Sequence, residues 1–145
     1  MAAATSVMRA QQIVLARVDA ALGPFGLTFA RYEALALLHF SRRGSLPLGK
    51  MGERLMVHPT SVTNAVDRLE SQGLVRRIPD PGDRRRVLAE ITAQGRALVE
   101  RATTALEEIR FGMGELAERE ADQVTRAIRK LRADAGDLGP SRDNS

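Results

Sequence analysis

The strongest constraint on the fold is a change in the spacing of apolar residues near residue 73. In residues 59–72 they recur about every 3.6 residues, as in an amphipathic helix. Residues 74–78 and 87–91 instead alternate with a period of about two, which predicts two strands. The segment between them, Pro79 to Arg86, is rich in turn-forming residues and arginine. The sequence therefore predicts a helix followed at once by a β-hairpin with a long, basic loop.

Helical periodicity accounts for most of the remaining chain. We expect helices at residues 5–22, 29–42, 48–55, 59–72, 93–115 and 118–134. Thr28 and Thr92 are predicted N-caps, His58 lies at the N-cap position of the fourth helix, and Gly73 is a candidate C-cap. The order α-α-α-α-β-β-α-α describes a mainly α protein with a small β-hairpin, which is typical of a winged helix-turn-helix.

The length and composition predict one globular protomer over residues 1–145. Within it we expect a DNA-binding lobe at 28–92, flanking helices at 5–22 and 93–134, and a flexible tail at 136–145. The flanking helices carry apolar stripes that a lone protomer would leave partly exposed. Packing on a second copy would cover them, so a homodimer is expected.

Several classes of function are excluded by residue counts. The chain has no Cys, which excludes disulfides, thiolate nucleophiles and Cys-ligated zinc. Its two histidines, His39 and His58, have no metal-ligand spacing. No nucleophile–base set or glycine-rich phosphate loop is visible, so we expect no enzymatic activity, no metal and no cofactor. No run of about 18 apolar residues and no signal peptide is found, which favours a cytoplasmic protein without a membrane partner.

The net charge of +4 is concentrated in the middle of the chain. Residues 42–92 contain ten basic and six acidic side chains, whereas residues 1–41 and 93–145 are nearly balanced. This distribution indicates that an anionic partner would meet the helix at 59–72 and the hairpin after it.

The outward face of the predicted helix at 59–72 carries short polar side chains suited to reading base edges. Asn64 has the amide geometry for a bidentate contact with adenine, and Arg68 could hold a phosphate or a guanine edge. Asp67 would repel phosphate, so we expect it to pair with a neighbouring arginine. The alternative is an ordinary solvated helix face. The candidate DNA-binding residues of this helix are Thr60, Ser61, Thr63, Asn64 and Arg68.

The hairpin contains five arginines within eleven residues, opposed by Asp80 and Asp83. Arginine inserted into a minor groove is favoured by the negative potential there. We expect Asp83 to orient one of these arginines through a charge-assisted hydrogen bond. The alternative is a solvent-exposed charged turn. The candidate DNA-binding residues of the hairpin are Arg76, Arg84, Arg85 and Arg86.

Residues 83–95 (DRRRVLAEITAQG) resemble the wing signature of the multiple antibiotic resistance regulator (MarR) family, and residues 48–77 and 27–38 resemble neighbouring segments of that family. The resemblance implies a homodimer formed by the N-terminal helix and the last two helices, with one winged helix per protomer on a palindromic operator. It also implies that a phenolic or other aromatic effector would bind near Phe29, Tyr32 and His39. His58 and Arg31 depart from the common pattern of the family, and the absence of Cys excludes its thiol-based peroxide sensing.

Together these observations predict a sequence-specific DNA-binding transcriptional regulator, more often a repressor than an activator. It would bind double-stranded operator DNA as a homodimer and be released by a small molecule. The alternative is a winged-helix module for protein interaction or for architectural DNA binding, without a ligand response.

Overall fold

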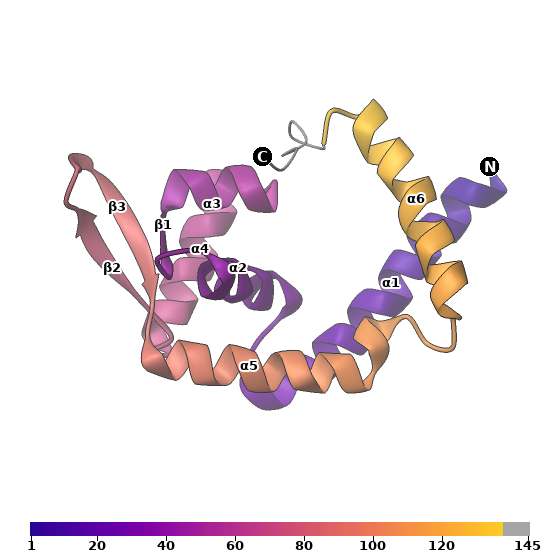
Figure 1. Cartoon of the computed structure of the whole chain (residues 1–145), viewed down its shortest axis with the longest axis horizontal. Helices are drawn as coiled ribbons and strands as arrows, with labels where there is room; N and C mark the ends of the chain where they lie inside the picture. The colour runs from indigo at the N-terminus through magenta and orange to yellow at the C-terminus, as the bar shows by residue number, and fades with distance from the viewer. Residues whose placement is uncertain (138–145) are drawn as a thin grey trace. The chain divides into compact units, whose positions relative to one another are not determined.

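The structure, a computed structural model, describes residues 1–137 and divides into two compact units, Met1–Gly112 and the residues from Met113 onward. The first unit holds helices α1 (Ala2–Leu22), α2 (Phe29–Phe40), α3 (Leu48–Leu55), α4 (Pro59–Ser71) and α5 (Ala93–Glu108), the short 3-10 turns η1 (Gly23–Phe25) and η2 (Arg110–Gly112), and strands β1 (Ser45–Pro47), β2 (Val75–Asp80) and β3 (Asp83–Ile91) (Figure 1). The second unit holds α6 (Glu118–Asp134). Most of the tail predicted at 136–145 lies outside the described residues.

The predicted winged helix-turn-helix is confirmed, with a third strand that the sequence did not reveal. The sheet is antiparallel in the order β1-β3-β2, and Leu46 of β1 pairs with Ala89 of β3. A strand of this length is too short to show a period of two. Pro47 lacks a backbone N–H, and it is tolerated because β1 is an edge strand.

The hairpin strands are longer than predicted. β2 and β3 pair as far as Asp80 and Asp83, so the loop expected at 79–86 shrinks to Pro81 and Gly82. An Asp80 carboxylate oxygen accepts a hydrogen bond from the Gly82 N–H at 2.9 Å and closes this turn. The arginines that follow are therefore part of a strand, but the ladder is irregular there. Pro79 pairs with Val87 and Asp80 pairs with Asp83, so Arg84, Arg85 and Arg86 bulge from the hairpin, which extends beyond the helices (Figure 1).

The predicted helix caps are confirmed. The side chains of Thr28, His58 and Thr92 accept hydrogen bonds from the backbone N–H groups of Arg31, Thr60 and Gly95. The fifth helix was predicted to run to residue 115, but α5 ends at Glu108. The backbone turns left-handed just after it, at Phe111 (φ 52°) and Gly112 (φ 78°).

One hydrophobic core holds the first unit together. Leu22, Leu35, Leu38, Met51 and Leu106 are fully buried, which joins the end of α1 to α2, α3 and α5. By contrast, α6 has no buried residue. Its apolar stripe is thus left uncovered by the described residues of the second unit.

No single helix in residues 1–137 is both long and apolar enough to cross a membrane. The stretches Ala2–Phe25 and Phe29–Phe40 pass that test only as a pair, by length and composition, and are bent by 70° relative to each other.

The start of α5 is packed closely against the end of α4 and the start of β2. Thr92 donates hydrogen bonds to two carbonyl oxygens there, from its hydroxyl to Gly73 at 2.8 Å and from its N–H to Leu74 at 3.0 Å. Gly95 lies in the same contact and is buried. A side-chain carbon at position 95 would overlap the Leu74 carbonyl oxygen and press on Ile91.

We expect Gly95→Ala to lower the free energy of unfolding by about 3 kcal/mol, because a methyl group there would push backbone apart inside the core. Gly49→Ala is the matched control, since a methyl group at this helical position meets no atom within 4 Å. It should leave stability unchanged or raise it by up to about 1 kcal/mol. Urea unfolding followed by circular dichroism measures both. Equal stability of the two variants would contradict this account of the α5 contact.

Candidate nucleic-acid interface

Helices α3 and α4 and the turn between them form a helix-turn-helix. Met56 ends α3 in the left-handed conformation (φ 56°, ψ 44°). The N–H of Val57 donates to the Gly52 carbonyl oxygen at 3.2 Å, which closes the turn. The sharp turn brings the first residues of α4 to the surface, where this motif presents its recognition helix.

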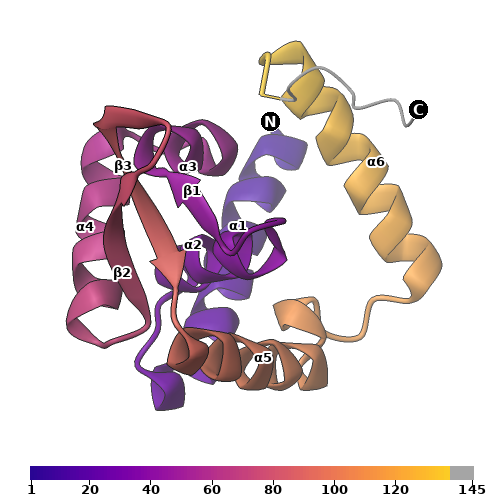
Figure 2. The ribbon, with the colours of Figure 1, turned by 60° about the vertical axis from the view of Figure 1, so that its left-hand side comes forward.

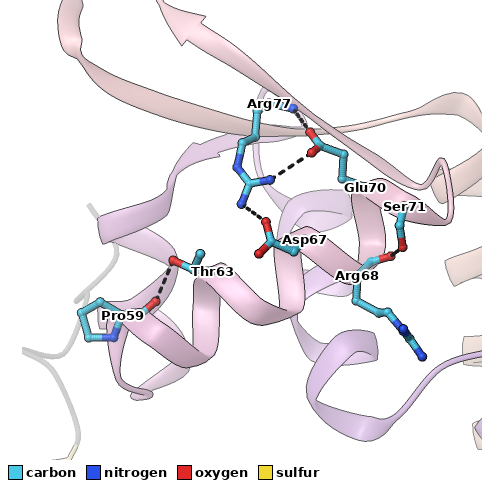
Figure 3. Close-up of polar contacts among 7 residues, drawn as sticks. All are labelled: Pro59, Thr63, Asp67, Arg68, Glu70, Ser71 and Arg77. Carbon is cyan, nitrogen blue, oxygen red and sulfur yellow. Dashed lines mark hydrogen bonds and ion pairs between the residues drawn. The ribbon is translucent and has the colours of Figure 1, made fainter.

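The predicted base-reading residues share the exposed face of α4. Val62, Val66 and Leu69 are buried and hold the opposite face in the core. Among the described residues, the side chains of Thr60, Ser61 and Asn64 have no hydrogen-bond partner, so their polar atoms are free to bind a ligand. The Thr63 hydroxyl donates to the Pro59 carbonyl oxygen at 3.1 Å, and Arg68 points away from the hairpin (Figure 3). The exposed residues that the structure brings together on this face are Thr60, Ser61, Thr63, Asn64 and Arg68.

The hairpin arginines divide into paired and unpaired side chains. Arg84 and Arg85 are exposed on β3 and have no ion-pair partner within residues 1–137. Arg86 lies 3.7 Å from an Asp80 carboxylate oxygen. Asp83 accepts a hydrogen bond from the backbone N–H of Arg85 at 2.9 Å. The expected hydrogen bond from Asp83 to an arginine of the hairpin is present, but it is made by the backbone N–H of Arg85 and not by a guanidinium group.

Arg76 lies in a different setting. It is opposite Glu90 in the ladder between β2 and β3, and its Nε donates to the Glu90 carboxylate at 2.6 Å. Its charge is thus already compensated by the neighbouring strand. The structure separates Arg76 from the free arginines nearer the end of the hairpin.

Arg77 joins the hairpin to α4. Its guanidinium group donates to Asp67 at 2.6 Å and to Glu70 at 3.0 Å, and its backbone N–H donates to Glu70 at 3.1 Å (Figure 3). The prediction that Asp67 pairs with an arginine is confirmed. Glu70 was missed by sequence reasoning, although its position three residues after Asp67 places both carboxylates on one side of the helix.

Lys50 is a further basic residue that sequence reasoning missed. It lies in the first turn of α3 and borders a hollow of about 520 Å³ between α3 and β3, to which Arg85 and Arg86 also contribute. Its ammonium group is 3.4 Å from the Glu53 carboxylate. The signal in the sequence was a lysine just after Pro47, at the start of a short helix.

The three predicted effector-binding residues all lie on α2, and they have different surroundings. Phe29 lines an apolar hollow of about 290 Å³ with Gln11, Val14, Leu15, Val18 and Phe111. Tyr32 is buried, and its hydroxyl group lies 2.8 Å from that of Thr103 on α5. His39 lies 3.7 Å from the Glu100 carboxylate. Of the three, Phe29 alone lines this hollow.

Within residues 1–137, no cluster of three or more His, Cys, Asp or Glu side chains could hold a metal ion. The polar groups described above offer hydrogen bonds and positive charge. This chemistry suits recognition of a polyanion.

Comparison with known proteins gives a consistent result. The family model described as "MarR family" matches residues 27–87. Sco5413, a MarR family transcriptional regulator from Streptomyces coelicolor, is 56% identical, with a TM-score of 0.89 and 97% of each chain covered. The HTH-type transcriptional regulator YhbI of Bacillus subtilis is 33% identical over 114 residues, which are 79% of this chain and 71% of that protein.

A third similar protein is BpsR of Bordetella bronchiseptica, whose DNA binding is regulated by 6-hydroxynicotinic acid. It is 28% identical, with a TM-score of 0.79, and the match covers 88% of this chain and 91% of that one. The family model covers residues 27–87, and the match to Sco5413 extends over 97% of the chain. The chain therefore belongs to the MarR family of DNA-binding transcriptional regulators.

Proposed function

We propose that this protein is a repressor that binds a palindromic operator as a homodimer, with α4 in the major groove and the hairpin in the adjacent minor groove. The observation that carries the proposal is the pairing of charges around α4. Arg84 and Arg85 have no ion-pair partner within residues 1–137, while the carboxylates of Asp67 and Glu70 beside the exposed polar face are held by Arg77. Such a surface attracts phosphates without presenting an unpaired carboxylate to them. A cytoplasmic location follows from this role.

The exposed apolar side chains support a homodimer. Val7, Met8 and Ile13 are exposed on α1, as are Val124 and Leu131 on α6. Packing these stripes against the same stripes of a second copy would remove them from water in an isologous interface. A two-fold dimer presents two copies of α4, which need half-sites about 10 base pairs apart, and this spacing corresponds to a palindromic operator.

The alternative role is a winged-helix module for protein interaction or architectural DNA binding. A gel-shift experiment with the DNA upstream of the protein's own coding region separates these roles. A repressor forms a complex with the labelled DNA that only unlabelled operator DNA displaces. An architectural protein binds unrelated DNA equally well, and an interaction module binds neither.

We expect Asn64→Ala and Arg85→Ala to weaken operator binding in different ways. Loss of Asn64 removes a base contact, so it should relax the preference at one position of each half-site by about 1–3 kcal/mol. Loss of Arg85 removes a phosphate or groove contact, so binding should weaken for all sequences and the salt dependence should fall by about one counterion. Fluorescence anisotropy over a salt series, with single-base operator variants, measures both effects.

Arg119→Ala is the control for net charge, since Arg119 is exposed at the start of α6, outside the helix-turn-helix and the hairpin. It should bind operator as the wild-type protein does. If Asn64→Ala and Arg85→Ala bound all operators like this control, α4 and the hairpin would not be the DNA-binding face.

The small-molecule response is proposed to begin at the hollow lined by Phe29 and Phe111. Two phenyl rings and three aliphatic side chains suit a flat aromatic compound, and Gln11 supplies one polar group. BpsR, whose DNA binding responds to an aromatic acid, supports this class of effector. An effector seated there would favour one arrangement of the protomer over another and so change operator affinity.

We expect an aromatic carboxylic acid, found by thermal shift from a panel, to raise the melting temperature and weaken operator binding. Phe29→Ala should lose both effects because one wall of the hollow is removed. Phe40→Ala is the matched control, since Phe40 is 75% exposed at the end of α2 and does not line the hollow. Equal ligand shifts in Phe29→Ala and in the wild-type protein would mean that the effector binds elsewhere.

A further inference from the structure

The hairpin is attached to α4 near its base through β2, while its other strand, β3, pairs with β1 as far as Leu88, opposite Ile78. Val75 is buried, and Arg77, two residues further along β2, points to the same face of the sheet. In Figure 2, β2 runs beside α4. Among the described residues, none beyond Arg77 in the hairpin forms a hydrogen bond or ion pair with α4. Arg77 is therefore the outermost polar contact between the hairpin and α4 within the described residues.

The contacts of Arg77 with Asp67 and Glu70, here called the Arg77 bridge, are more numerous and less exposed on the arginine side than a single surface ion pair. The Arg77 side chain is only 26% exposed, compared with 59% for Asp67 and 44% for Glu70. Within its planar guanidinium group, Nη1 donates to the Glu70 carboxylate and Nη2 donates to the Asp67 carboxylate. The backbone N–H of Arg77 also donates to Glu70. A fork that binds two groups at once fixes an angle, which a single flexible ammonium group does not.

The Arg77 bridge also acts on charge. Asp67 and Glu70 are three residues apart on α4, where two like charges repel each other. Asp67 is on the side of the helix that carries Thr63 (Figure 3), close to the surface proposed to meet DNA. Without Arg77, both carboxylates would also repel the phosphates. Charge neutralisation alone would need only a cation nearby, whereas the observed geometry also fixes direction.

We propose that Arg77 is a positioning residue for DNA recognition. By bridging Asp67 and Glu70 it holds the hairpin at a fixed angle to α4, so that Arg84 and Arg85 reach the same DNA that α4 reads. The consequence for DNA rests on the proposed function, but the fixed angle is a property of the free protein and is tested without DNA.

The first experiment measures the angle in the free protein. Because the chain has no Cys, spin labels can be placed with Ser71→Cys at the end of α4 and Gly82→Cys at the hairpin turn. A side chain at position 82 meets only the Asp80 carboxylate, at an ordinary 3.5 Å. Labelled chains are mixed with excess unlabelled chains, so that distances within one protomer dominate pulsed electron spin resonance.

We expect one narrow distance distribution in the parent protein and a distribution about twice as broad in Arg77→Met and Arg77→Lys. Met binds neither carboxylate, and the flexible Lys ammonium group lacks the planar fork that fixes the angle between them. Arg119→Met, which removes the same charge elsewhere, should leave the distribution narrow. An unchanged distribution in Arg77→Met would overturn the proposal, whatever the DNA result. If Arg77→Met does not fold, Asp67→Asn with Glu70→Gln breaks the same bridge from the other side and takes its place.

The second experiment is a double-mutant cycle on operator DNA between Arg77 and Arg85, which do not contact each other. Arg77→Met and Arg85→Ala should each weaken binding about tenfold, but Arg85→Ala should cost less than about threefold once Arg77 is gone, since a misdirected hairpin no longer places Arg85 on DNA. Additive losses would instead indicate lost charge or general destabilisation and would overturn the positioning role.

A variant that lacks all three charges separates direction from repulsion. Arg77→Met with Asp67→Asn and Glu70→Gln removes the carboxylates as well as the bridge, so it should still bind weakly if direction matters. Recovery of wild-type affinity would mean that Arg77 serves only to neutralise the two carboxylates, and it would overturn the proposal. If the parent protein binds no DNA specifically while the distance distributions broaden as expected, the proposed function fails and the fixed angle stands.

Discussion

The burial of one face of α4 is the constraint on which the rest of the interface depends. Val62, Val66 and Leu69 lie in the core with Leu35 and Met51, which anchors the helix from behind. Burying such side chains contributes roughly 1.5–3 kcal/mol each, far more than any surface contact in this region. Because the helical period is fixed, anchoring this face forces the short polar side chains to point outward. The core thus selects which residues can read DNA.

A second set of contacts ties the hairpin and α5 to that anchored helix. Thr92 bonds to the carbonyl groups of Gly73 and Leu74, where α4 passes into β2. Gly95 allows the first turn of α5 to touch the same segment. At the other end of the same connection, Arg77 holds β2 against α4. These contacts join the start of α5 to the base of the hairpin, and the Arg77 bridge joins the hairpin to α4.

The sequence predicted the elements whose signal is repetitive or chemically distinctive. The buried stripe of α4, the caps at Thr28 and Thr92 and the Asp67–arginine pair all follow from local spacing. β1 was missed because its pairing with β3 is a long-range contact and its three residues carry no period. The end of α5 was misplaced because the left-handed turn at Phe111 depends on packing against α1, where Arg17 donates to the Gly112 carbonyl oxygen at 3.0 Å. Tyr32 and His39 were grouped with Phe29 by resemblance alone, and the contacts of Tyr32 with Thr103 and of His39 with Glu100 could not be predicted from local spacing.

The positions of the acidic residues explain where the positive charge of the middle segment acts. Each of the six acidic side chains in residues 42–92 has a partner, five of them a basic side chain and Asp83 a backbone N–H. Five of these carboxylates pair with Lys50, Arg76, Arg77 and Arg86. The excess positive charge is therefore carried by arginines that have no ion pair in the described chain. Arg68, Arg84 and Arg85 are three of them, and they lie on the recognition helix and the outer hairpin. The other three are Arg42, Arg43 and Arg54, so half of the arginines in this segment that lack an ion pair in the described chain belong to α4 and the outer hairpin.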